Sequence, residues 1–162
     1  MTFRLLFWKR RVRTPTVFQM EMVESGATAL GILLAYHGRR VPLEELRLAC
    51  GASREGSQPH DLVRAAHGYG LVAVSRVRAA DDVLKGPFPV IVQWNVDQFL
   101  VVEGVSGSKV YLNDPRTGPR EVSRQEFSDS FKGVSLEFKK GAAFTRGGAE
   151  LSLAAKLGRR LK

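Results

Sequence analysis

The chain of 162 residues has very little cysteine and histidine, and these shortages limit what it can be. Cys50 is the only cysteine, which excludes a disulfide framework within the chain and is typical of a reducing compartment. No Cys/His pair stands at metal-ligand spacing, so we expect no metal site. No apolar run is long enough to span a bilayer, and the sequence has no phosphate-binding glycine loop. We therefore expect no cofactor in this domain.

Acidic residues are outnumbered by basic ones, and the excess is concentrated at the two ends of the chain. Lysine and arginine total 25 against 16 aspartates and glutamates, for a net charge of +9. Positive charge at both ends indicates terminal segments that lie near a membrane surface, more than a basic binding face on the domain. We predict a basic N-terminal tail over residues 1–11 and one domain over 12–140. A linker and an amphipathic basic segment over 141–162 would then lead toward a transmembrane region.

The remaining sequence predicts helices first and strands afterwards. A nearly all-apolar helix is expected from Ser25 to Gly38, with Ser25 as its N-cap residue. Two shorter helices follow, one after Pro42 and one over Pro59–His67. Later segments alternate or are rich in β-branched and aromatic residues, which indicates strands. They are Leu71–Arg76, Phe88–Trp94, Phe99–Val105, Lys109–Asn113 and Ser135–Phe138. The predicted fold class is α+β.

Several short motifs stand in a specific order along this framework. They are Gln19-Met20-Glu21, Glu24-Ser25-Gly26, Trp94-Asn95-Val96-Asp97-Gln98-Phe99 and Asn113-Asp114-Pro115. Over roughly residues 12–138 the chain resembles the peptidase C39 family, the bacteriocin-processing domains at the N-terminus of peptide-exporting ABC transporters. The resemblance implies a papain-like cysteine peptidase fold, with N-terminal helices packed on an antiparallel sheet.

The resemblance also assigns catalytic positions, and two of them carry unexpected residues. Ser25 stands where the family has its cysteine nucleophile, and Gln98 where it has the histidine base. Asp114 matches the aspartate that orients the base, and Gln19 the oxyanion donor. A serine hydroxyl is a poor nucleophile without a base, and a glutamine cannot accept and return a proton near neutral pH. We therefore expect these positions to be inactive relics.

No other residue is a good substitute for the missing base. His37 follows the core helix at roughly 18 Å from Ser25, and His60 and His67 lie around the third predicted helix. We interpret all three as ordinary polar residues. Cys50 ends a helix without a nearby histidine and is expected to act as a small buried hydrophobic residue.

The leading hypothesis is a non-catalytic C39-like domain of a bacterial ABC transporter that exports a bacteriocin or a related ribosomal peptide. It would bind the leader of the precursor through Ser25, Trp94, Asn95 and Gln98, at the cytoplasmic face of the cell membrane. Its partners would be that leader and the transporter's transmembrane and ATPase domains. The alternative is an active double-glycine leader peptidase whose gene encodes cysteine and histidine at positions 25 and 98. A nucleic-acid partner is not expected, because Arg64 is the only fixed positive charge on the third helix.

Overall fold

The computed structural model describes residues 9–18, 24–51 and 56–148 and contains helices and strands in the predicted order. The helices are α2 (Ser25–His37), α3 (Leu43–Ala49), α4 (Pro59–Gly68), α5 (Ala80–Val83) and α6 (Arg124–Ser130). The strands are β1 (Lys9–Arg11), β2 (Arg39–Arg40), β3 (Leu71–Val77), β4 (Val90–Trp94), β5 (Gln98–Ser106), β6 (Lys109–Asp114), β7 (Gly118–Ser123), β8 (Phe131–Lys140) and β9 (Gly147–Gly148).

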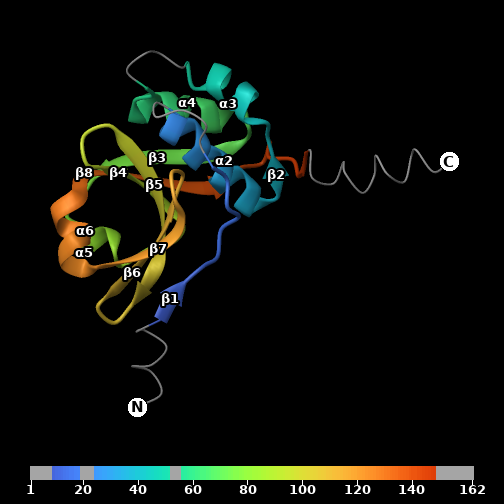
Figure 1. Ribbon diagram of the computed structural model, residues 1–162. Coiled ribbons are helices and arrows are strands. Elements are labelled where there is room, and N and C mark those ends of the chain that lie inside the picture. The colour runs from blue at the N-terminus through green and yellow to red at the C-terminus, as the bar shows by residue number, and fades with distance from the viewer. Residues whose placement is uncertain (1–8, 19–23, 52–55, 149–162) are drawn as a thin grey trace.

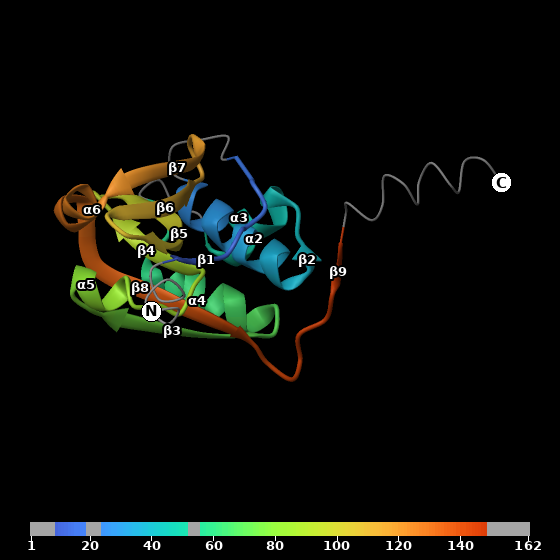
Figure 2. The same cartoon turned by 90° about the horizontal axis from the view of Figure 1, so that it is seen from below.

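Seven of these strands form one antiparallel sheet in the order β3-β8-β4-β5-β6-β7, with β1 paired to β5 beside this path. The short strands β2 and β9 pair with each other in parallel. Figure 1 shows α2, α3 and α4 grouped on one side of the sheet, and α5 with α6 on another. Figure 2, from below, shows β3 and β8 running along one side of the molecule.

The core helix α2 is buried from Ser25 to Leu34, as its nearly uninterrupted apolar sequence predicts. It ends at His37, and Gly38 follows in a left-handed conformation with φ of 106°, where glycine is favoured. Leu30, Leu33 and Leu34 are fully buried in a cluster shared with α3, α4 and the facing side of the sheet. This packing places the N-terminal end of α2 beside strand β5.

The central strands bury both of their faces. Phe99 and Val101 of β5 belong to the cluster around α2, whereas Leu100 and Val102 belong to a second cluster with α5 and α6. This division follows from the alternation of side chains along a strand. Because both faces are covered, residues 99–102 of β5 form a continuous apolar run in the sequence.

The structure departs from the sequence-based boundaries at both ends of the domain. Lys9–Arg11, expected in the N-terminal tail, form β1 and pair with Gly104–Ser106 of β5. At the other end, Phe144 packs against the α2 cluster, and the Gly141 N–H donates to the Gly70 carbonyl at 2.9 Å. Residues 141–148 therefore lie against the domain, although the sequence assigned them to a linker. The amphipathic basic segment predicted further on, over 151–162, lies outside the described residues.

Within the described ranges, none of the helices is both long enough and apolar enough to span a membrane.

Candidate functional site

Ser25 lies at the first turn of α2 and points toward the sheet. Its side chain is buried, with 2% exposed, and its Oγ accepts a hydrogen bond from the Phe99 backbone N–H at 3.0 Å. The predicted N-cap role is wrong, because Glu24 is the N-cap residue and Ser25 is already helical. The hydroxyl instead satisfies a buried N–H of β5, so it joins the helix start to the strand.

The start of α2 is held by close packing and by a buried ion pair. A Cβ atom added at Gly26 would lie 3.2 Å from Ser57 Cβ and 3.3 Å from Phe99 Cδ2, so a side chain there would crowd its neighbours. The buried Glu24 carboxylate pairs with Arg47 of α3. The contacts of Glu24 and Gly26, which flank Ser25, therefore fix the position of Ser25 between α3, α4 and β5.

Gln98, the residue at the predicted base position, is the first residue of β5 and directly precedes Phe99. It is half-buried and lies opposite Trp94 in the antiparallel register. Among the described residues, its side chain has no hydrogen-bond partner. The turn that joins Trp94 to Gln98 is exposed, and Asn95 within it has a positive φ of 51°.

Asp114 lies on β6, on the same face of the sheet as Gln98. Val101 pairs with Asn113 and Val102 with Leu112, so the continued register sets Leu100 opposite Asp114. Gln98 is two residues from Leu100 and therefore on the same face, diagonal to Asp114. Such diagonal neighbours lie about 7–8 Å apart, within reach of long side chains. The three positions Ser25, Gln98 and Asp114 thus gather at one end of β5, and we call this cluster the relic site.

The Asp114 carboxylate is engaged by an arginine that the sequence analysis missed. Its Oδ2 accepts from Arg120 Nη2 at 3.2 Å and Nε at 3.3 Å, and its Oδ1 accepts from the Arg116 backbone N–H at 2.9 Å. The Arg120 guanidinium also lies over the Trp94 ring, 5.7 Å from its centroid. Arg120 comes from β7, for which no strand was predicted. If a strand had been predicted after the turn at Asp114–Gly118, the hairpin register would have placed Arg120 opposite Leu112, close to Asp114.

The predicted peptide-contact residues differ in how accessible they are. Asn95 is exposed and Gln98 is half-buried. Ser25 and Trp94 have only 2% and 3% exposed. The Trp94 ring packs 5.7 Å from the Phe127 ring within the second core cluster. The accessible part of the predicted contact surface is therefore the 95–98 turn.

A second group of missed residues anchors the segment that leads to α2. The buried carboxylate of Glu103 accepts from the Thr14 N–H at 2.6 Å and from Thr14 Oγ1 at 2.7 Å. Asn113 donates from Nδ2 to Thr14 Oγ1 at 2.8 Å and to the Pro15 carbonyl at 3.1 Å. Asn113 thus supports the approach to the relic site. Gln19, the predicted oxyanion donor, lies outside the described residues.

The histidines lie elsewhere in the structure. His37 ends α2, where burial first and the charge of Lys140 second lower its pKa. His60 is exposed and pairs with Asp61 at 3.3 Å, and His67 contacts the Ala73 backbone at 3.2 Å. Across the ranges that the structure describes, no histidine is hydrogen-bonded to Ser25 or Asp114.

Cys50 is fully buried at the end of α3, as the sequence predicts for its position. Burial raises the pKa of its thiol to about 11, so the thiol stays protonated at neutral pH. In the described part of the chain, no three His, Cys, Asp or Glu side chains are grouped to hold a metal ion.

The relic site can form hydrogen bonds, but its residues are unsuited to proton transfer. The Ser25 hydroxyl already accepts from an amide, and Gln98 offers a carboxamide that does not titrate near neutral pH. Asp114 is negatively charged when ionised and has a cationic partner in Arg120. The three positions lie near one another, and neither a serine hydroxyl nor a carboxamide supplies the thiolate or the base of a cysteine peptidase.

Comparison with known proteins gives consistent matches. The model of the peptidase C39 family matches residues 13–143. The colicin V secretion/processing ATP-binding protein CvaB of Escherichia coli is 30% identical over 139 residues, which cover 86% of this chain and 20% of that protein. The chain thus spans about a fifth of the length of the curated relatives it matches.

Two crystal structures are similar over most of the domain. One is a double glycine motif protease from an AMS/PCAT transporter in complex with the leader peptide. It is 40% identical with a TM-score of 0.79, covering 82% of this chain and 95% of that one. The other is the peptidase domain of Streptococcus ComA, 18% identical with a TM-score of 0.73 over 82% and 99% of the two chains. These likenesses confirm the predicted papain-like fold, with N-terminal helices packed on an antiparallel sheet.

Proposed function

Because the chain belongs to the peptidase C39 family, we propose that it is a non-catalytic member that binds the leader of an exported precursor peptide. It holds the leader against the relic site and the 95–98 turn without cutting it. The domain acts for an ABC transporter that exports a bacteriocin or a related ribosomal peptide, at the cytoplasmic face of the bacterial membrane. ATP binds to another domain of that transporter.

One observation carries the non-catalytic part of this proposal. Ser25 and the start of β5 are in hydrogen-bond contact, and Gln98 lies at that point of β5 with Asp114 diagonal to it. This proximity supports reading positions 25 and 98 as those of the nucleophile and the base, and a serine and a glutamine occupy them. In the serine protease subtilisin, loss of the cooperating nucleophile and base lowers the rate by about 10⁶-fold.

The order of the surrounding structure supports the binding part. Asp114 and Asn113 are held by hydrogen bonds, and the 95–98 turn joins the paired strands β4 and β5. A relative that is 40% identical has been crystallised in complex with its leader peptide, which supports a leader as the partner. The curated relatives are secretion and processing ATP-binding proteins, which supports a transporter as the context.

Titration with a synthetic double-glycine leader peptide tests the proposal. We expect a dissociation constant of micromolar order, about −8 kcal/mol, as befits transient handling of cargo. The amide signals of residues 95–99 should shift in NMR spectra, and mass spectrometry should find the peptide intact. Helix-in-groove recognition would make the affinity depend on apolar leader positions at i, i+3, i+4 and i+7.

A pair of substitutions locates the binding surface. Gln98→Lys places a long charged side chain in the relic site and should weaken leader binding at least tenfold. The control is Gln125→Lys on α6. The neighbouring Arg124 N–H donates to the Ser108 carbonyl in the turn between β5 and β6, so Gln125 lies near the opposite end of β5 from Gln98. Equal binding by both variants would contradict the proposal, as would leader cleavage that disappears in Ser25→Ala.

A further inference from the structure

Strand β3 forms one edge of the large sheet, and the His67 side chain covers this edge at Ala73, whose N–H donates to His67 Nε2 at 3.2 Å. Strand β3 is the terminal strand of the sheet path and pairs only with β8 among the described strands. Its register with β8 runs from Leu71 to Val77 without a shift, so no bulge interrupts it. Natural proteins protect such edges with prolines, bulges or several charges. The sequence LVAVSRV has no proline and a single charged residue, Arg76.

Apolar side chains are exposed along this strand. Val72 and Val74 have 39% and 42% of their surface exposed, and Val77 has 89%. Val72, Val74 and Arg76 share one face because residues alternate along a strand. Residues 74–77, beyond the position covered by His67, keep a regular pairing with β8 and expose Val74 and Val77, so this part of the edge has the properties of a template for a short added strand.

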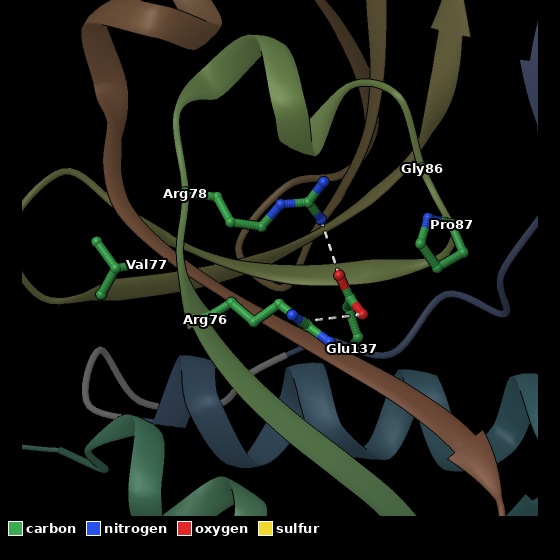
Figure 3. Close-up of a pocket in the computed structure, with 6 residues that line it drawn as sticks. All are labelled: Arg76, Val77, Arg78, Gly86, Pro87 and Glu137. Atoms are coloured by element: carbon green, nitrogen blue, oxygen red, sulfur yellow. Dashed lines mark hydrogen bonds and ion pairs between the residues drawn. The ribbon is translucent and has the colours of Figure 1, made fainter.

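A charged pocket lies at the C-terminal end of the same strand. It has a volume of about 510 Å³ and is lined by Arg76, Val77, Arg78, Gly86, Pro87 and Glu137. Figure 3 shows both arginine side chains directed toward Glu137, whereas Val77 points away from it. Because two guanidinium groups share one carboxylate, the lining of the pocket keeps an excess of positive charge.

The two arginines differ in how fully they are engaged. Arg78 Nη1 donates to Glu137 Oε1 at 2.8 Å, its Nη2 donates to the Asp82 carbonyl at 2.6 Å, and only 22% of its side chain is exposed. Arg76 is 55% exposed, and its Nε lies 3.5 Å from Glu137 Oε2. In the described part of the chain, the terminal nitrogens of Arg76 have no hydrogen-bond acceptor. Arg76 can therefore bind a second carboxylate with two parallel N–H donors.

We propose that the outer edge of β3 at residues 74–77, next to the position covered by His67, accepts an extended acidic segment of a peptide partner as an additional strand, with one carboxylate of that segment bound by Arg76. Main-chain hydrogen bonds to β3 supply the affinity, and the Arg76 pocket selects the acidic residue and the register. The net charge of +9 favours the approach of an acidic partner.

This surface is separate from the relic site. On β8, Phe131 lies opposite Trp94 and Glu137 opposite Val90. Phe131 and Glu137 are six residue steps apart along β8, a distance of about 20 Å. The inference does not depend on leader binding at the relic site, so either can fail alone.

The probe is an acetylated and amidated heptapeptide of alternating threonine and valine with a single central glutamate, titrated into the full chain. We expect shifts of the β3 amides in NMR spectra. Replacing the peptide's glutamate by glutamine should weaken binding about tenfold, the loss of a charge-assisted bidentate contact. Arg76→Gln should weaken binding of the glutamate peptide similarly and leave the glutamine peptide unchanged.

Two controls separate strand addition from charge alone. Lys109 is a comparable positive charge on a strand: its side chain is 62% exposed and pairs with Glu121 of the neighbouring strand at 3.4 Å. Lys109→Gln should therefore leave binding of the peptide unchanged. A heptapeptide N-methylated at alternate residues keeps the carboxylate but loses main-chain donors, and it should not bind. Equal binding of the methylated peptide would overturn the proposal. So would self-association of the chain through β3, or Arg76-dependent binding to anionic vesicles with no binding of the heptapeptide.

Discussion

Ser25 carries a hydroxyl and Gln98 a carboxamide, at two positions where a cysteine peptidase would need a thiol and an imidazole. The Ser25 hydroxyl accepts the Phe99 N–H at 3.0 Å, and the Gln98 side chain projects from the adjacent residue of β5. Asp114 lies diagonal to Gln98 and remains ionically paired with Arg120. At the scale of single residues, the positions of Ser25, Gln98 and Asp114 therefore allow a direct test in which a thiol and an imidazole are introduced together.

We predict that Ser25→Cys combined with Gln98→His gives specific cleavage of a double-glycine leader, measured by mass spectrometry. A thiol at the start of α2 would benefit from the helix dipole, and an imidazole at position 98 would supply the base. The base alone contributes about 10²–10⁴-fold. Each single substitution should remain inactive, because neither group works without the other.

The matched control adds Asp114→Asn to the double variant, which should lower its rate while leader binding is retained. If the double variant binds the leader yet does not cut it, residues beyond positions 25 and 98 have diverged as well.

His37 is expected to make stability depend on pH, because its surroundings disfavour its protonated form. Burial, and then Lys140, hold the pKa of His37 below its usual value of 6.5. Its Nε2 is buried without a described hydrogen-bond partner, and its ring lies edge-on to Tyr36 and Phe144. As the pH falls below 6.5, His37 becomes protonated in the unfolded chain before it does in the folded chain. The free energy of unfolding therefore falls as the pH falls from about 6.5 toward the lower pKa of the folded state.

We therefore predict that the urea midpoint decreases between about pH 7.5 and 5.5, and that His37→Gln reduces this decrease. His60→Gln, at an exposed histidine, should leave the slope unchanged. An identical pH dependence in His37→Gln and the parent chain would show that other groups are responsible.

At the scale of elements, the N-terminal segment is fastened to β5 and β6 by two buried polar side chains. Glu103 bonds Thr14 twice and pairs with Arg11 at 3.4 Å, and Asn113 bonds Thr14 and Pro15. Strand β1 continues this attachment along β5. These contacts hold residues 11–15 against β5 and β6.

We predict that Glu103→Gln lowers the free energy of unfolding by about 2–3 kcal/mol, because charge-assisted hydrogen bonds are lost in a buried setting. Amide hydrogen exchange at Val12 and Thr14 should accelerate. Glu121→Gln, half exposed and paired only with Lys109 among the described residues, should change stability little. A loss of equal size in both variants would mean that the Glu103 contacts are not responsible.

At the scale of the whole molecule, the segment after β8 returns to the domain. Phe144 packs on the α2 cluster, and β9 pairs with β2 beside the end of α2. We predict that deletion of residues 141–162 lowers the melting temperature by several degrees, since removing Phe144 exposes apolar surface worth about 1–2 kcal/mol.

Deletion of residues 149–162 alone should leave the melting temperature nearly unchanged, and Phe144→Ala in the full chain should account for most of the larger loss. A large drop on removing 149–162 would show that the last segment also stabilises the domain.

The sequence by itself determined the features that depend on local pattern. The uniform apolar character of residues 27–34 specified a buried helix, and Gly38 specified its end. The order of helices and alternating segments specified the α+β class, and the resemblance to the peptidase C39 family pointed to one site at Ser25, Gln98 and Asp114. Strand β7 and the full length of β8 were missed, because their polar residues lack a clear alternating pattern.

Only the tertiary structure decided how the distant segments satisfy one another. The Ser25 hydroxyl bonds a residue 74 positions away in place of its own helix terminus. Asp114 is paired with Arg120, Glu103 holds Thr14, and β3 is left at the sheet edge. Local propensity contains no information about such contacts, because each partner is brought within reach only when the sheet register and the helix packing have formed.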